Sequence, residues 1–223
     1  MTPRRPLAAL CWALLAIIAA ASVATQFGRT ILLASDHGPP VSTEVIRFLS
    51  MFTIQSNVFV LVLAATLALH PHRDGDRWRV VRLDALLGIT VTGLVYAVVL
   101  APTDHPVGLG WWTNAGLHYV SPVATLLLWL AFGPRPRITG ATVAWALVWP
   151  VLWIGYTLVH GAVSHWYPYP FLDVRDLGYA VALRNLGVIV LLALLFLLAF
   201  RAVDRRLPGT FPREVVTADR RSP

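Results

Sequence analysis

Five polar side chains lie close together in the second long apolar stretch of this 223-residue chain. They are Ser50, Thr53, Gln55, Ser56 and Asn57. At about 100° per residue, Ser50, Thr53 and Asn57 fall on one stripe of a helix. Inside a membrane such groups need hydrogen-bond partners, so the stripe must face protein or water. This pattern is typical of helices that hydrogen-bond to one another, and it also suits a hydroxyl nucleophile.

A histidine that could activate such a hydroxyl lies in another apolar stretch, at His118. Neutral imidazole can take the proton of a Ser or Thr hydroxyl, which then attacks an ester carbonyl. No carboxylate is securely placed to orient the ring, since Asp104 and Asp173 fall in loops and Asp84 near the opposite end of its helix. The residues therefore indicate a dyad, or a triad completed by Asn. The alternative is a histidine that hydrogen-bonds to a neighbouring helix and serves only in helix packing.

The same side of the membrane collects further polar groups, which we predict to line a substrate pocket. They are Gln55, Asn57, Asn114, His160, Arg184 and Asn185. From the helix rise, Ser50 lies about 9 Å and Thr53 about 14 Å from Glu44, and His118 about 5 Å into its helix. These depths put hydroxyls, imidazoles and a guanidinium in one layer, which favours a polar pocket that opens outward.

A zinc site is a competing use of His118, His160 and His165. The chain has no HExxH motif and no acidic ligand near these histidines. Cys11 is the only cysteine, which excludes disulfides and thiolate metal sites within one chain. We therefore expect no metal and no cofactor.

The composition belongs to the membrane class, with 57% hydrophobic and 13% charged residues. A span needs about 20 mainly apolar residues. Six stretches qualify: 7–26, 44–69, 80–101, 115–132, 139–163 and 181–202. We predict an all-α integral membrane protein with a six-helix transmembrane domain over residues 1–206. The polar segment 207–223 is predicted to be a disordered cytoplasmic tail.

The basic residues, all of them Arg, set the orientation. Four lie in the predicted outer segments: Arg29, Arg47, Arg175 and Arg184. The other fourteen lie in the segments assigned to the inside, including Arg82 and Arg201 at the inner ends of the third and sixth spans. The positive-inside rule then puts both termini in the cytoplasm. Short, separate clusters of this kind indicate contact with anionic lipid and exclude a nucleic-acid surface.

Residues 1–26 also resemble a secretory signal, and cleavage would leave five spans. Because the apolar run is nearer to span length, we favour an uncleaved helix. The absence of Lys beside abundant Ala, Val, Arg and Pro suggests a bacterium, and hence a bacterial plasma membrane. The sequence shows no internal repeat of the kind that many transporters have. It also shows no filter sequence and no ring of charge of the kind that channels have.

Three segments resemble the conserved blocks of the androgen-induced-protein family of six-span membrane proteins, and most closely its bacterial branch. They read RFLSMFTIQSN, LHYVSPVATLLLWLAFG and WYPYPFLDV. The resemblance covers about residues 44–200. The block around His118 and the block from Tyr169 to Leu172 are its most specific parts.

The animal members of that family are membrane-embedded threonine hydrolases that cleave fatty acid esters of hydroxy fatty acids with one Thr and one His. The resemblance implies that His118 is the base. The family threonine falls at Ser50, while the nearest threonine is Thr53, and the base would activate either hydroxyl. We expect a hydrolase acting on a lipid or acyl ester of the membrane. The alternative is a non-catalytic membrane protein that binds lipid or protein partners.

Overall fold

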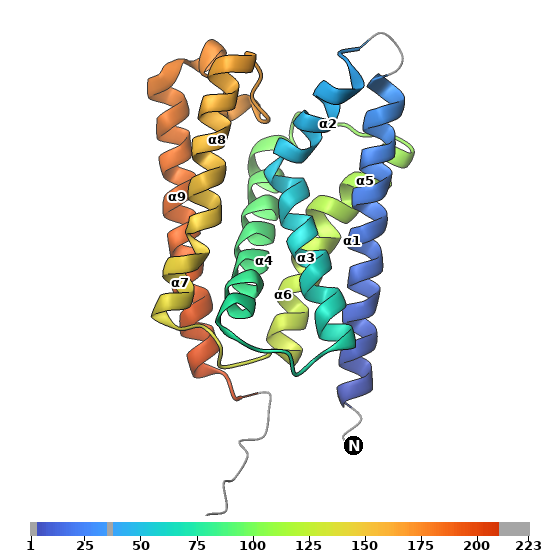
Figure 1. Cartoon of the computed structure of the whole chain (residues 1–223), viewed down its shortest axis with the longest axis vertical. Coiled ribbons are helices and arrows are strands. Elements are labelled where there is room, and N and C mark those ends of the chain that lie inside the picture. Colours follow the sequence, from blue (N-terminus) through green and yellow to red (C-terminus); the bar gives the residue numbers. More distant parts are fainter. Residues whose placement is uncertain (1–3, 35–37, 210–223) are drawn as a thin grey trace, which may run out of the picture.

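The computed structural model describes residues 4–34 and 38–209, and these residues form helices and no strands. Six helical stretches are long and apolar enough to cross a membrane, as predicted. In chain order the elements are α1 (Arg4–Ala34), α2 (Val41–Ser50), α3 (Phe52–Leu69), α4 (Asp76–Val95) with η1 (Tyr96–Leu100), α5 (Leu109–Ala115) with η2 (Gly116–Val120) and α6 (Ser121–Phe132), α7 (Gly140–Ala146), α8 (Val148–Ser164), η3 (Pro170–Leu172) and α9 (Val174–Arg206). The start of α1 and the end of α9 lie at the same end of the bundle (Figure 1).

Several helices extend beyond the predicted apolar stretches. The first runs on to Ala34, the fourth begins at Leu109 rather than near Ala115, and the sixth begins at Val174 rather than Val181. Once a helix is nucleated, polar residues can continue it, so apolar length underestimates helix length. The last helix ends at Arg206, and most of the predicted tail, residues 210–223, lies outside the described residues.

The second predicted span, 44–69, is broken at Met51. This residue has extended backbone angles (φ −70°, ψ 124°) that end α2 and start α3. The Gln55 amide donates a 2.9 Å hydrogen bond to the Leu49 carbonyl across the break. Ser50 and Thr53 therefore do not share the continuous helical stripe that the sequence suggested.

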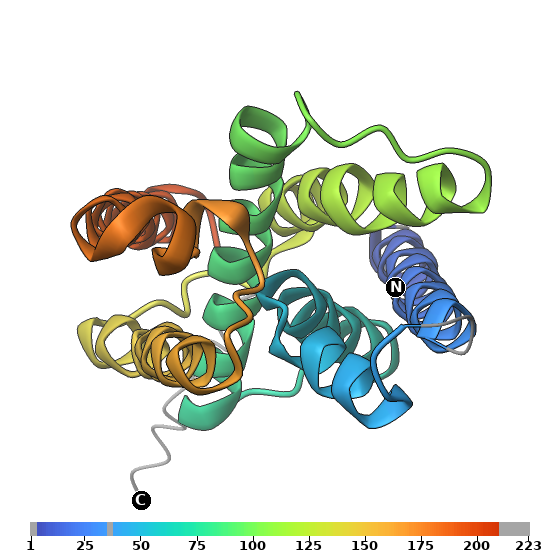
Figure 2. The same cartoon turned by 90° about the horizontal axis from the view of Figure 1, so that it is seen from above.

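The centre of the bundle is α4, with α8 and α9 on one side and α1, α3 and α6 on the other (Figure 2). Small buried residues such as Ala19 and Ala64 let α1 and α3 pack closely. Between α8 and α3, by contrast, the contacts are made by large aromatic rings. Phe52 stacks on Trp149 with ring centroids 4.7 Å apart, and it meets Trp153 edge-on at 5.0 Å. Such bulky contacts leave space beside the start of α3.

Candidate active site

Thr53 and His118 are brought together by the break in the second span. Thr53 lies in the first turn of α3 and is 7% exposed. Its Oγ1 is 3.4 Å from His118 Nε2, at the long end of hydrogen-bond range. A looser contact of this kind is common for a nucleophile and its base when no substrate is bound.

A chain of hydrogen bonds orients the His118 ring. Its Nδ1 lies 2.6 Å from Asn114 Oδ1, and Asn114 Nδ2 donates to the Tyr96 hydroxyl at 2.5 Å. Tyr96 in turn donates to Asp104 Oδ2 at 2.9 Å. Because the Asp104 carboxylate can only accept, the donor and the acceptor of each hydrogen bond in this series are fixed. Asn114 must present its carbonyl oxygen to His118, so Nδ1 carries the proton and the Nε2 lone pair faces Thr53.

The two rings of this hydrogen-bonded series, Tyr96 and His118, lie in π-helical turns. Tyr96 begins η1 and His118 lies in η2, and the two rings stack with centroids 4.0 Å apart. A π-turn adds a residue to the helical turn and rotates the side chains that follow. The helices that carry them also approach closely, since a Cβ on Gly93 would come within 2.8 Å of Pro122. The ring stack thus depends on two local irregularities and a tight helix crossing.

Asn57, a predicted pocket residue, has another role in the structure. It is fully buried, and its amide donates to the carbonyls of Thr53 (2.9 Å) and Leu117 (3.2 Å). Leu117 directly precedes His118 in the chain. Asn57 therefore joins the backbone that carries the hydroxyl to the backbone that carries the imidazole.

Ser50, the alternative nucleophile, forms its hydrogen bonds with groups other than the histidine. Its hydroxyl lies 2.7 Å from the Ile46 carbonyl and 2.6 Å from the Tyr156 hydroxyl. Its own carbonyl accepts from the Trp153 indole at 2.9 Å. These bonds join α2 to α8 and use both polar groups of Ser50. The structure thus pairs Thr53 with His118 and gives Ser50 a packing role.

Tyr169, which the sequence indicated only as part of a family block, lies at the site. Its hydroxyl accepts from the Thr53 backbone N–H at 3.1 Å and lies 3.2 Å from Thr53 Oγ1. Burial raises the pKa of the Tyr169 phenol, which keeps it a neutral hydrogen-bond donor. This phenol lies at the N-terminal end of α3, so it adds a hydrogen-bond donor at the positive end of the helix dipole. Its place beside Thr53 comes from a contact between residues 116 positions apart.

An apolar cavity of about 70 Å³ begins beside Thr53 and Tyr169. It lies between α4, α8 and α9, with Phe171 and Leu172 of η3 at one end and Leu87 and Ala193 toward the other. Most of the lining is aliphatic and aromatic side chains. Val190, one of the lining residues on α9, is 37% exposed on the surface of the bundle. An alkyl chain fits this lining better than a polar ligand does.

The remaining predicted pocket residues do not line this cavity. Gln55 accepts from the Trp149 indole at 2.8 Å, and His160 stacks on Tyr156. Arg184 is exposed, while Asn185 donates to the Phe171 carbonyl at 3.0 Å and so holds η3 against α9. The six predicted residues therefore do not line one polar pocket, and the cavity beside Thr53 is lined mainly by apolar side chains. The polar side chains that do line the cavity are those of Thr53, Thr92, Tyr96 and Tyr169.

Among the described residues, no group of three or more His, Cys, Asp and Glu side chains is placed to hold a metal ion. The partners of His118 are Asn114, Thr53 and the Tyr96 ring, and none of them is a strong metal ligand. The local chemistry is that of a hydroxyl, an imidazole and an amide.

Comparisons with protein-family models, with curated proteins and with solved structures find no match for this chain.

Proposed function

We propose that this protein is a multi-pass membrane hydrolase of fatty acyl esters, with Thr53 as the nucleophile and His118 as the general base. The observation that carries the proposal is the hydrogen-bonded series Thr53–His118–Asn114, of which Thr53 lines an apolar cavity. A hydroxyl, a base and a group that orients the base are the parts that acyl transfer requires. The resemblance to the androgen-induced-protein family points to the same chemistry.

In the proposed reaction, His118 Nε2 takes the Thr53 proton as Oγ1 attacks the ester carbonyl. The oxyanion that forms would accept hydrogen bonds from the Tyr169 hydroxyl and from the N-terminal end of α3. His118 then gives the proton to the departing alcohol, which leaves an acyl group on Thr53. Water, deprotonated by His118, then attacks this acyl group. The fatty acid is released, and His118 returns the proton to Thr53 Oγ1, which restores the hydroxyl.

The acyl chain would lie in the cavity, with its carbonyl at Thr53. From Leu186 to Ala193 the lining residues of α9 span about 10 Å at the rise of an α-helix. Half-exposed Val190 on this wall supports access from the side, where lipid chains surround the bundle. A long-chain lipid ester is therefore the proposed substrate class.

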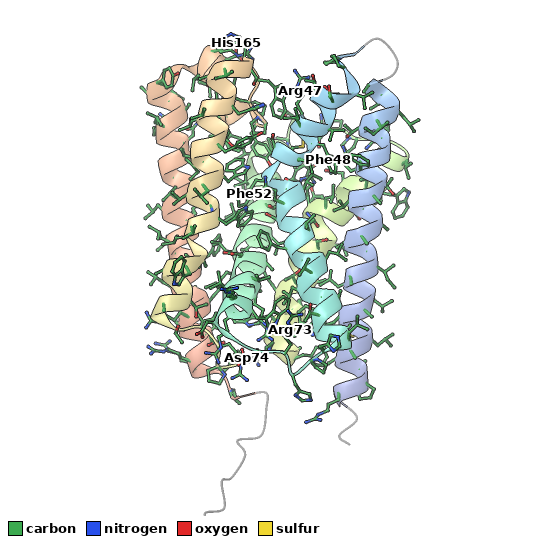
Figure 3. The ribbon with its side chains drawn as sticks, viewed as in Figure 1. Arg47, Phe48, Phe52, Arg73, Asp74 and His165 are labelled. Atoms are coloured by element: carbon green, nitrogen blue, oxygen red, sulfur yellow. The ribbon has the colours of Figure 1, made fainter. Side chains whose placement is uncertain are left out.

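The proposed location is a bacterial plasma membrane, with both termini in the cytoplasm and the site in the outer leaflet. The Arg distribution supports this orientation. The start of α1 and the end of α9 lie at one end of the bundle, and Phe52 lies well away from that end (Figure 3).

Labelling of the purified protein with a fluorophosphonate tests the proposal, because the nucleophile displaces fluoride and forms an O–P bond with the probe. We expect labelling of the wild type and of Ser50→Ala, and none of Thr53→Ala or His118→Ala. Ser50→Ala is the matched control, since it removes a hydroxyl of the same segment. Labelling that persists in Thr53→Ala refutes the assignment. A folded wild type that is neither labelled nor active on nitrophenyl esters favours the non-catalytic, lipid-binding alternative.

A further inference from the structure

A second polar site lies at the opposite end of the bundle, where Arg73 and Asp74 are found (Figure 3). Three arginines surround Asp74, and we call Asp74, Arg79, Arg82 and Arg137 the basic cluster. Arg79 donates to both Asp74 oxygens, at 2.8 and 3.0 Å, and Arg137 Nε lies 2.9 Å from Oδ2. Asp74 is therefore already engaged by two guanidinium groups.

Arg82 is buried without enough acceptors. It is 6% exposed, and its Nη1 is 3.8 Å from Asp74 Oδ1, which is too far for a hydrogen bond. Its Nη2 donates to the Arg73 carbonyl, while Nε and Nη1 have no hydrogen-bond partner within the described part of the chain. A buried guanidinium with unused donors is costly unless an anion or another acceptor completes it.

The other carboxylates near the basic cluster do not meet this demand. Asp204 Oδ2 accepts from the backbone N–H groups of Arg137 and Ile138, at 2.7 and 2.8 Å. The Asp76 side chain is fully exposed and reaches only Arg79, at 3.6 Å. The hydrogen bond from Arg79 holds the pKa of Asp74 at about 2, so this carboxylate is ionised at neutral pH. Its negative charge is balanced by Arg79 and Arg137, which bind it directly. The guanidiniums of Arg79 and Arg137 thus share the Asp74 carboxylate. Asp204 also lines the small space beside them, and its Oδ1 has no hydrogen-bond partner among the described residues.

That space is a cavity lined by Arg79, Arg82 and Arg137 on its polar side and by rings such as Trp12 and Trp129 on its apolar side. Its volume is about 20 Å³, which suffices for a group the size of one water molecule. One phosphate oxygen fits it, with the rest of the phosphate outside. The helix ends around it would lie at headgroup level if the six helices cross a membrane.

We propose that the basic cluster binds the phosphate of an anionic lipid headgroup, with Arg82 as the buried donor. A guanidinium offers several N–H groups in a plane that matches phosphate oxygens, and basic pockets between membrane helices recognise such headgroups. This site is separate from the proposed active site and does not depend on it.

Thermal unfolding of the purified full chain in neutral detergent tests the proposal. Dioctanoyl phosphatidylglycerol should raise the unfolding temperature of the wild type, and dioctanoyl phosphatidylcholine should raise it much less. In Arg82→Gln the half-maximal lipid concentration should rise about tenfold or more, as expected for loss of a charged hydrogen bond. Arg77→Gln is the matched control, because Arg77 is an exposed arginine of the same helix, and its titration should equal that of the wild type.

Inorganic phosphate at constant ionic strength distinguishes the two sources of the anion. Stabilisation by the lipid alone assigns the site to headgroups, and stabilisation by both assigns it to the phosphate group itself. If Arg82→Gln does not fold, Arg82→Lys, which keeps the charge and loses the planar fork, should weaken binding in the same direction. Equal titrations of the wild type and the folded Arg82 variant overturn the proposal. So does a wild type that responds equally to both lipids or to no anion.

Discussion

The hydrogen bond from His118 to Asn114 makes the sharpest prediction about the proposed chemistry. In Asn114→Leu the branched shape and the number of side-chain heavy atoms are kept, but the acceptor 2.6 Å from His118 Nδ1 is lost. A buried N–H without a partner costs about 1–3 kcal/mol. The tautomer with its lone pair toward Thr53 loses that much stabilisation. At about 1.4 kcal/mol per factor of ten, reactivity should fall about ten- to a hundredfold.

The assay is the second-order rate constant for fluorophosphonate labelling, with kcat/KM on a nitrophenyl ester as a second measure. Asn114→Asp is the informative partner variant, since a carboxylate restores the acceptor for Nδ1. We expect it to label within several-fold of the wild type. Labelling of Asn114→Leu at the wild-type rate refutes the orienting role. Equal losses in the Leu and Asp variants do so as well, because they point to packing rather than to the acceptor.

Three further predictions concern the rest of the molecule. Asn57→Leu should lower the labelling rate and also destabilise the fold by about 1–3 kcal/mol in urea unfolding, because two buried carbonyls lose a donor; unchanged values of both contradict the joining role. Ala193→Phe should lower activity on long-chain esters but not on acetate esters, with exposed Leu191→Phe as the control; equal loss on both esters contradicts an acyl cavity. The pKa of Asp74 is depressed to about 2 from 3.8, so its stabilising effect is present above about pH 4 and is lost as the pH falls toward 2. The unfolding temperature of the wild type should therefore fall more steeply than that of Asp74→Asn over this range, and parallel curves contradict the ion pairing.

Much of the fold follows from local sequence. The six helices that are long and apolar enough to cross a membrane were predictable, because each needs only enough consecutive apolar residues, which the sequence shows directly. Helix ends were less predictable, as at Leu109 and Val174, since polar residues continue a helix that apolar packing has already nucleated. The break at Met51 carries no Gly or Pro that would announce it.

The sequence by itself determined which chemistry was available: a histidine, nearby hydroxyls and an asparagine in one predicted layer. Only the tertiary structure decided that Thr53, rather than Ser50, meets His118. That choice depends on the backbone at Met51 and on the two π-turns. It also needs contacts such as Tyr169 to Thr53, between residues far apart in the chain. Periodicity assumes regular helices and neighbours in sequence, and this site is built where the helices are irregular and the neighbours are distant.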